Sequence, residues 1–523
     1  MNPKPGLLLL LLAPAALGWG PALAQTNGPL SAIDWLRQSA VSPEPGAYPV
    51  TPPSLAGGGN GISVRALDAL RPEAVGLYPA ARVGLPATLW GPTSAGTLAE
   101  LIEALPADML PSLRDRTLHL LLAEFNAPLP EPGLDGVARP DFLLARVDKL
   151  VEFGALDHAA AVLDALGSSD PLLRLRRFDI GLLLGDEHQA CIGVLIDQPP
   201  VGDDAATVFC LARDGRWQEA SDLLDQAALS GSISAYESDL LTHFVHGDER
   251  LPGASSLLPP PTGTPSPLVW RLLEAAGDPV STLGLPVAFA HADLRGTIGW
   301  RAQLEAAERL VRVGALSPNR LLGLYTERRA AASGGIWERV RAVQALDEAI
   351  HSGDPAAAGA ALLDAWPLIQ AGELEVAMAN LYALPLRQLA LTGEAGDLAF
   401  RIGLLSEDYE TVALALPANA PGEARFLAAV ARGLDPALAG SMPGELAPAV
   451  ALAFGPTPPE PEGLRDRLAQ GRLGEEILRV LAQLGGPGDP RMLAEGLTTL
   501  RILGLEDTAR RTALESLLLE RHG

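Results

Sequence analysis

The feature that most constrains this chain is a helix–turn–helix pattern that recurs between Arg139 and Ser230. Each unit has an apolar helical run, a short polar turn containing a glycine, and a second run rich in alanine. The turn glycines Gly154, Gly185 and Gly215 follow one another at intervals of 31 and 30 residues. A self-similar unit of this length cannot bury its apolar face alone, and it is typical of stacked helical arrays.

Small and aliphatic residues recur at fixed offsets from these glycines. Alanine stands five residues after each one, and an aliphatic residue stands nine after: Ala159, Ala190 and Ala220, then Leu163, Val194 and Leu224. Alanine favours helix and lets helices approach closely, so these positions predict an inward face. The pattern returns less regularly around Gly353, Gly372 and Gly504.

These units resemble tetratricopeptide-type repeats in the turn and in the start of the second helix. The matching residues are Asp214-Gly215-Trp217-Ala220 and Gly185-Asp186-Ala190. The period here is shorter, and the family's Trp and Leu-Gly signature and closing proline are missing. The resemblance implies an all-α fold, a right-handed solenoid of helical hairpins, after a short irregular or β-containing N-terminal segment. It also implies a function in binding proteins or peptides, which is an analogy at the level of fold.

Pro/Gly-rich stretches divide the chain into candidate segments. We expect a signal peptide (1–24), a short helix with a Pro/Gly-rich linker (25–61), an extended and helical segment (62–138), TPR-like repeats (139–250), a Pro-rich linker (251–267), degenerate repeats (268–454), a second Pro-rich linker (455–463) and a C-terminal helical cap (464–523).

The charge balance excludes one class of partner. The net charge is −24, and the densest basic clusters are as short as Arg174-Leu175-Arg176-Arg177 and Arg328-Arg329. A polyanion of this kind is repelled by nucleic acid and by anionic membrane surfaces. The sequence therefore predicts neither a nucleic-acid partner nor stable membrane insertion.

The first 24 residues have the features of a cleavable export signal. Lys4 gives a minimal basic region, Leu7 to Leu12 form an apolar core, and Ala22-Leu23-Ala24 is a small-x-small cleavage site. We expect cleavage after Ala24 and export to a periplasm, with secretion as the alternative.

The two cysteines stand in a compartment that permits disulfides. Cys191 and Cys210 are placed symmetrically about the turn at Pro199-Pro200, so in an antiparallel hairpin they lie abreast. This spacing favours a disulfide, and two buried free thiols are the alternative.

The region before the repeats contains a short amphipathic run and an extended part. Ser31–Gln38 places Trp35 and Leu36 on one helical face. It either docks on a partner or folds back on its own body. Further on, Ile62–Leu67 and Ala74–Tyr78 are candidate strands of a hairpin.

The chemically richest stretch is 289–340, where histidine, arginine, carboxylate and aromatic residues gather. Arginine and aromatic side chains are frequent anchors of protein interfaces, and a carboxylate–histidine pair can do acid–base work. Salt bridges between repeats are the structural alternative. The candidate partner-binding residues are Trp35, Leu36, His291, Asp293, Arg295, Trp300, Tyr325, Glu327, Arg328, Arg329 and Trp337.

Motifs of catalysis and of metal or cofactor binding are weak in this sequence. His243 and His246 lack a third ligand of the kind a zinc site needs, and we expect no metal and no cofactor. Glu237-Ser238 and Glu515-Ser516 share the Glu-Ser pair of soluble lytic transglycosylases, but both fall in predicted repeat or cap helices. The sequence favours a non-enzymatic periplasmic scaffold with a protein partner. The alternative is a peptidoglycan- or glycan-binding protein with a cleft at 289–340.

Overall fold

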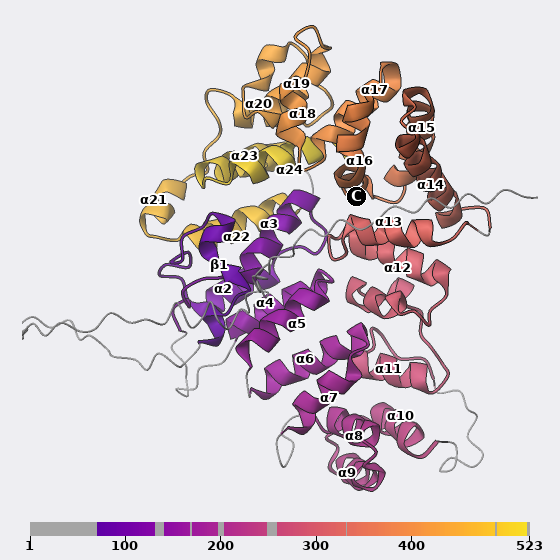
Figure 1. The fold of residues 1–523 in the computed structure, drawn as a ribbon. Helices are drawn as coiled ribbons and strands as arrows, with labels where there is room; N and C mark the ends of the chain where they lie inside the picture. Colours follow the sequence, from indigo (N-terminus) through magenta and orange to yellow (C-terminus); the bar gives the residue numbers. More distant parts are fainter. Residues whose placement is uncertain are drawn as a thin grey trace, which may run out of the picture. The chain divides into compact units, whose positions relative to one another are not determined.

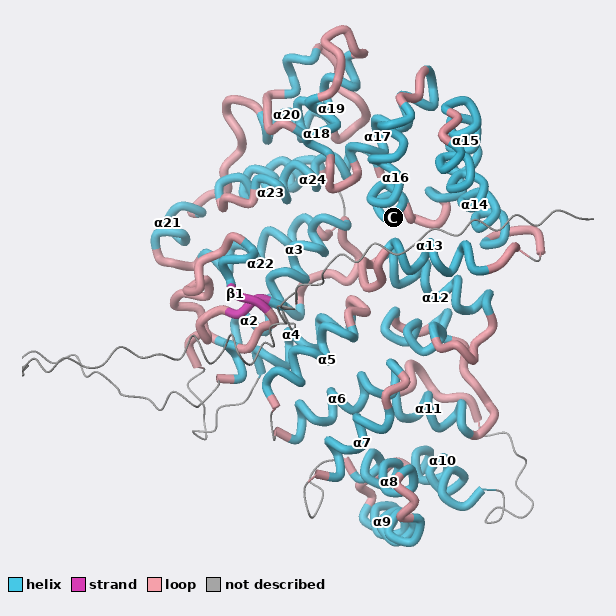
Figure 2. The backbone as a smooth tube through the Cα atoms, viewed as in Figure 1, coloured by secondary structure: helices cyan, strands magenta, loops and turns pink. Residues whose placement is uncertain are grey.

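The structure, a computed structural model, is mostly helical and has almost no strand in the residues it describes (Figures 1 and 2). The described residues are 71–130, 141–167, 170–196, 203–247, 259–330, 332–486 and 489–519. All of them belong to one compact unit, Leu67–Gly523. The predicted all-α class is confirmed. The expected signal peptide and the segment carrying Trp35 and Leu36 lie outside the described residues.

The first described elements are short, and they include a pair of two-residue strands. They are η1 (Pro72–Ala74), β1 (Tyr78–Pro79), η2 (Ala80–Val83), α2 (Ala95–Glu103), α3 (Pro111–Leu122) and β2 (Ala123–Glu124). β1 pairs in parallel with β2, with Tyr78 opposite Ala123. The predicted strand 74–78 is therefore wrong, because Ala74 ends a 3-10 helix that Pro72 begins. Its expected partner 62–67 lies outside the described residues.

The repeat region forms the predicted helical hairpins. Its helices are α4 (Asp141–Glu152), α5 (Leu156–Leu166), α6 (Pro171–Leu184), α7 (Glu187–Leu195), α8 (Asp204–Arg213), α9 (Trp217–Ser230) and α10 (Ala235–His246). Gly154, Gly185 and Gly215 each join two packed helices with a positive φ of 72–80°, which glycine adopts at little cost. The three alanines at the fixed offset are buried, as predicted.

Helical pairs continue through the middle of the chain. The elements are α11 (Pro267–Ala275), η4 (Thr282–Gly284), η5 (Val287–Leu294), α12 (Trp300–Arg312), α13 (Pro318–Glu327), α14 (Ile336–Ser352), α15 (Pro355–Gln370), α16 (Glu375–Leu389) and α17 (Gly393–Leu404). α12 packs on α13 and α14 on α15. Many packed pairs of this kind are compatible with a helical-repeat fold.

The last part of the chain has shorter helices and longer connections. It contains α18 (Tyr409–Leu414), α19 (Gly422–Ala431), η6 (Pro436–Ala439), α20 (Ala447–Phe454), α21 (Leu464–Ala469), α22 (Leu473–Leu484), α23 (Pro490–Ile502) and α24 (Glu506–Leu518). The Pro-rich stretch 455–463 connects α20 to α21 without a helix of its own.

Several helices begin where the sequence places an acidic residue before a proline. Asp170, Asp354 and Asp489 each accept a hydrogen bond from a backbone N–H in the first turn, at 2.8–2.9 Å. The proline that follows each one needs no N–H partner and has a helical φ already. These pairs fix the starts of α6, α15 and α23 from local sequence alone.

The last helices return to pack against the first ones. One apolar core contains residues of α2 and α3 together with residues of α22, α23 and α24. α22 packs on α2 and α24 on α3, and Figure 1 shows the yellow and indigo ends of the chain side by side. Such contacts join residues that are almost 400 positions apart, which no local pattern encodes.

A buried carboxylate fixes the contact between α24 and α3. Glu515 accepts hydrogen bonds from the backbone N–H of Ser112, at 3.0 and 3.1 Å, and from its hydroxyl at 2.7 Å. The residue before α3, Leu110, offers no side-chain cap of its own. Glu515 therefore caps a helix distant in sequence, and its negative charge lies at the positive end of that helix.

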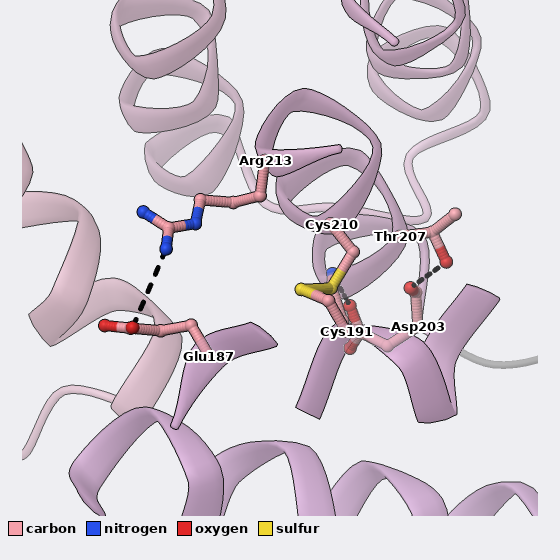
Figure 3. The surroundings of a disulfide bond; sticks show 7 residues. Glu187, Cys191, Asp203, Thr207, Cys210 and Arg213 are labelled. Carbon is pink, nitrogen blue, oxygen red and sulfur yellow. Dashed lines mark hydrogen bonds and ion pairs between the residues drawn. A yellow bond between two sulfur atoms is a disulfide. The ribbon is translucent and has the colours of Figure 1, made fainter. Parts of the chain in front are cut away.

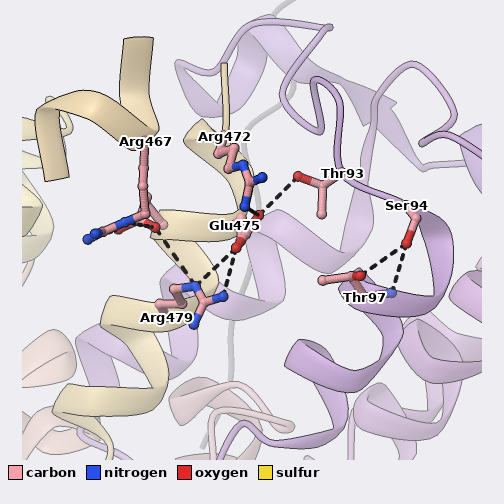
Figure 4. Close-up of polar contacts among 8 residues, drawn as sticks. Thr93, Ser94, Thr97, Arg467, Arg472, Glu475 and Arg479 are labelled. Atoms are coloured by element: carbon pink, nitrogen blue, oxygen red, sulfur yellow. Dashed lines mark hydrogen bonds and ion pairs between the residues drawn. The ribbon is translucent and has the colours of Figure 1, made fainter. Parts of the chain in front are cut away.

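A second polar contact holds α22 near the start of α2 (Figure 4). Glu475 is buried, accepts a hydrogen bond from the Thr93 hydroxyl at 3.3 Å, and pairs with Arg479 at 2.7 Å. The backbones approach closely here, because the Gly474 N–H donates to the Leu89 carbonyl at 3.1 Å. A Cβ on Gly474 would lie 2.6 Å from the Trp90 ring.

We expect Glu515→Ala to lower the free energy of unfolding by about 2–3 kcal/mol, because it leaves the buried Ser112 backbone N–H without this acceptor. Urea unfolding monitored by circular dichroism measures the change. Ser516→Ala is the matched control: its hydroxyl bonds only the carbonyl of Thr512 in its own helix. Equal losses in the two variants would contradict the role given to Glu515.

The carboxyl group of Asp179 on α6 is largely buried, which disfavours its ionised form. Its side chain is 25% exposed, and its nearest cation, Arg176, lies 4.0 Å away and is shared with Asp148. Burial raises the pKa of Asp179 from 3.8 to about 7, and the neighbouring Asp203 and Asp148 add to the rise. The folded chain therefore holds a proton here between pH 4 and 7 that the unfolded chain releases.

This difference in bound protons makes the Asp179 contribution to stability fall as the pH rises from 4 to 7. We expect the free energy of unfolding of Asp179→Asn to equal that of the original chain near pH 4. At pH 8 we expect it to be more stable, by on the order of 2–4 kcal/mol. Urea unfolding of both chains at the two pH values measures the difference. A pH-independent difference would show that Asp179 ionises normally in the folded chain.

Candidate binding site

The stretch 289–340 turns most of its predicted contact residues toward the chain itself. His291 is buried, and its Nε2–H donates to the carbonyl of Gly154 at 2.7 Å; burial lowers the pKa of this imidazole. The aliphatic part of Arg295 lies against Gly185. Two residues predicted to meet a partner thus pack against the turns of the first two repeats.

Asp293 and Arg295 make polar bonds to the segment that precedes them. Asp293 accepts a hydrogen bond from the Thr282 hydroxyl, and burial raises its pKa. Arg295 pairs with Glu274 at 2.5 Å and lies 5.7 Å from the centre of the Trp270 ring. These contacts join η5 to α11 and η4. They correspond to the structural alternative, in which the charged residues of this stretch form contacts within the chain.

Of the predicted aromatic residues of the stretch, Trp300 and Tyr325 are buried and Trp337 is half-buried. Trp300 is buried 5.2 Å from the ring of Trp337, and its indole N–H donates to the Leu324 carbonyl. Tyr325 is fully buried, and its hydroxyl donates to Glu308 at 2.5 Å. This carboxylate and burial raise the pKa of Tyr325 well above its ordinary value, so the hydroxyl keeps its proton.

The remaining predicted residues are exposed at the end of α13. Glu327 pairs with its neighbour Arg328 at 3.0 Å, and Arg329 is exposed beside them. The structure thus separates the predicted set into a buried group and a surface group. It does not bring them together around one cleft.

The cysteines meet where the sequence predicts (Figure 3). A disulfide joins Cys191 on α7 to Cys210 on α8, with Cα atoms 5.1 Å apart. Glu187, one turn before Cys191, pairs with Arg213 at 3.7 Å and with Arg271 of α11 at 2.8 Å. The bond therefore fastens two successive hairpins at a point that also contacts α11.

Another concave surface lies where early, middle and late helices meet. Two cavities, of about 510 and 190 Å³, have a common wall of five residues: Pro111, Arg114, Arg312, Val313 and Glu373. We call the two cavities together the junction trough. Its walls come from α3, the turn between α12 and α13, the turn between α15 and α16, the start of α23, and α24.

The lining of the junction trough has an apolar part, which we call its floor, and a charged part, which we call its edge. Its apolar lining includes Met109, Leu110, Leu118, Val313, Leu316, Val376, Leu446, Met492, Leu493 and Leu519. Its charged lining comprises Asp108, Arg114, Asp115, Arg312, Glu373, Glu407, Asp489 and Arg511. Mixed apolar and charged walls are suited to holding a polypeptide segment or another amphiphilic ligand.

Glu373 stands in the wall common to both cavities with an unusual backbone. Its φ is +53°, a left-handed conformation that costs a non-glycine residue about 1 kcal/mol or more. The preceding Gly372 carbonyl accepts two hydrogen bonds from the Arg312 guanidinium, at 3.0 and 3.2 Å. Backbone strain of this kind is found most often at functional sites.

The sequence did not predict the junction trough. The sequence pattern marked the turn at Gly372, next to the lining residue Glu373, and the Glu-Ser pair that contains Ser516, but neither as part of a binding site. Arg114, Arg312 and Met492 occur in helices whose pattern carries no local sign of a site. They become neighbours only in the folded chain, where α3, α12 and α23 line one cavity.

No protein-family model matches this chain, and comparisons with curated proteins and with solved structures also return no match. Within the described ranges, no three His, Cys, Asp or Glu side chains gather closely enough to hold a metal ion. Of the helices in the described part of the chain, none has the length and apolar character needed to cross a membrane.

Replacing both cysteines, as Cys191→Ala with Cys210→Ala, should lower the free energy of unfolding by about 3 kcal/mol, because the bond closes a loop with a sequence separation of 19. Urea unfolding measures the loss. Mass spectrometry of a non-reduced digest should show one peptide joining the two cysteines. Free thiols in exported protein would contradict this assignment.

Proposed function

We propose that this protein is an exported, non-enzymatic helical-repeat scaffold that binds a segment of a protein partner in a cell-envelope assembly. The hairpins around Gly154, Gly185 and Gly215 support a right-handed solenoid of tetratricopeptide-like type. The disulfide supports an oxidising compartment, in keeping with the signal peptide predicted at residues 1–24. The periplasm is the favoured location, and secretion is the alternative.

The observation that carries the proposal is the junction trough. A concave surface with an apolar floor and charged edges, framed by packed helices, has the properties of a groove for a polypeptide segment. Because its walls come from distant parts of the chain, the groove depends on the fold as a whole. Binding would need no chemical step, only shape and complementary side chains.

The alternative, a glycan-acting protein with its cleft at 289–340, requires side chains open to a ligand. His291, Trp300 and Tyr325 are buried and bonded within the chain. The Glu-Ser pair at Glu515 also has a structural partner, since its carboxylate caps α3. The geometry therefore favours the scaffold over the glycan-acting alternative.

The proposal is tested by a photo-crosslinking amino acid placed at Met492, which lines the trough and is 41% exposed. We expect irradiation of cells to give an adduct of one defined mass with an envelope protein. The same amino acid at Leu229, which is 90% exposed on α9 outside the trough, is the control. We expect no such adduct from the control position.

A second variant shows whether the contact depends on the trough. Crosslinking from Asp108, at the edge of the trough, should be lost when Met492→Trp fills the floor, with the melting temperature unchanged. The same adducts from Met492 and Leu229, or none from Met492 in folded exported protein, would overturn the proposed function.

A further inference from the structure

The cations and the carboxylates of the junction trough are not equally available. Arg114 is 5% exposed and donates to the Ala107 carbonyl at 2.7 Å. Arg312 is the most open of the three, with 38% of its side chain exposed, and it donates twice to the Gly372 carbonyl. Arg511 is 18% exposed and lies 3.9 Å from Asp115. All three guanidinium groups are thus engaged within the walls.

The carboxylates of the same walls reach solvent. Asp108 is fully exposed, and Asp115 and Glu373 are nearly half exposed. Glu407 and Asp489 are exposed at the two ends. Although Glu373 lies 3.4 Å from Arg312 and Asp108 lies 4.0 Å from Arg114, the carboxylates outnumber the guanidiniums and face outward. An incoming ligand therefore meets negative charge first.

We infer that the occupant of the junction trough is a basic, aliphatic polypeptide segment of a partner protein, with Lys or Arg beside Leu-like side chains. This inference rests on the proposed function and names the chemistry of the partner. Its cations face the exposed carboxylates, and its aliphatic side chains cover the floor formed by residues such as Val313, Val376 and Met492. Charge complementarity of this kind favours one partner class and speeds association.

Two features favour a segment over a single small cation. The two cavities of the trough have five lining residues in common, including Glu373, and each offers apolar surface beside it. The carboxylates also line both cavities: Asp115 and Glu407 belong to the smaller one, and Asp108 and Asp489 to the larger. A peptide segment that alternates cationic and aliphatic residues matches both the carboxylates and the apolar surface. The net charge of −24 attracts such a segment from a distance.

The test is fluorescence anisotropy with the exported chain and three labelled ten-residue peptides. One contains Lys and Leu among Gly and Ser, the second replaces Lys by Glu, and the third replaces Leu by Ser. We expect the Lys–Leu peptide to bind at least tenfold more tightly than either of the others. Met492→Trp should abolish this binding, and added salt should weaken it.

Charge variants decide whether the trough itself attracts the peptide. Glu373→Gln combined with Asp489→Asn should weaken binding of the Lys–Leu peptide three- to tenfold. Glu394→Gln combined with Asp397→Asn is the matched control, because it removes the same charge from exposed positions of α17. We expect the control to change the affinity less than twofold.

Each other outcome overturns the inference, and the outcomes separate it from the proposed function. Suppose that the Lys–Leu and Glu–Leu peptides bind equally well and that Met492→Trp abolishes the binding of both. The trough would then still bind peptides, as the proposed function says, but its partner would not be selected by positive charge. If both charge variants weaken binding of the Lys–Leu peptide equally, the peptide is attracted by the overall charge of the protein and not by the trough. If no peptide binds the chain but a chain shortened by residues 520–523 does bind, the chain's own segment is the occupant. Failure of the crosslink from Met492 would overturn the proposed function itself.

Discussion

The contact of α24 with α3 is the interaction on which the rest of this structure depends. Glu515 is buried, and the Ser112 backbone N–H and hydroxyl donate hydrogen bonds to its carboxylate, which offsets the cost of burying it. The same contact brings late aliphatic residues such as Leu514 into one core with early ones such as Leu113. Without it, the N-terminal helices would lose one side of their packing, and the trough would lose a wall.

The junction trough is a consequence of this packing. Neither α3, nor the turn at Gly372, nor the start of α23 forms a cavity alone. Where they meet, Arg114 and Arg312 take the carbonyls of irregular backbone as partners, which leaves the carboxylates facing solvent. The lining therefore holds five carboxylates and three guanidinium groups, and this excess of negative charge gives the groove its expected selectivity.

The stretch 289–340 shows the limit of interpreting function from residue types. His291, Arg295 and Trp300 have the chemistry of interface anchors, and here they act within the chain. His291 satisfies the carbonyl of a repeat turn, and Trp300 packs beside Trp337. Histidine, arginine and tryptophan serve a junction between helices as well as they serve an interface between proteins. Sequence alone does not distinguish the two because it does not report burial.

The sequence by itself determined the local structure of this protein. Turn glycines at Gly154, Gly185 and Gly215 and the inward alanines are decided within a few residues of backbone, so their pattern was sufficient to predict them. The Asp-Pro helix starts are equally local, although no prediction was based on them. The cysteine pairing followed too, because a helical hairpin fixes which residues lie abreast. Only the tertiary structure decided the contact of Glu515 with Ser112 and the junction trough. Both join residues far apart in sequence, and which of many similar apolar faces pack together depends on the whole chain.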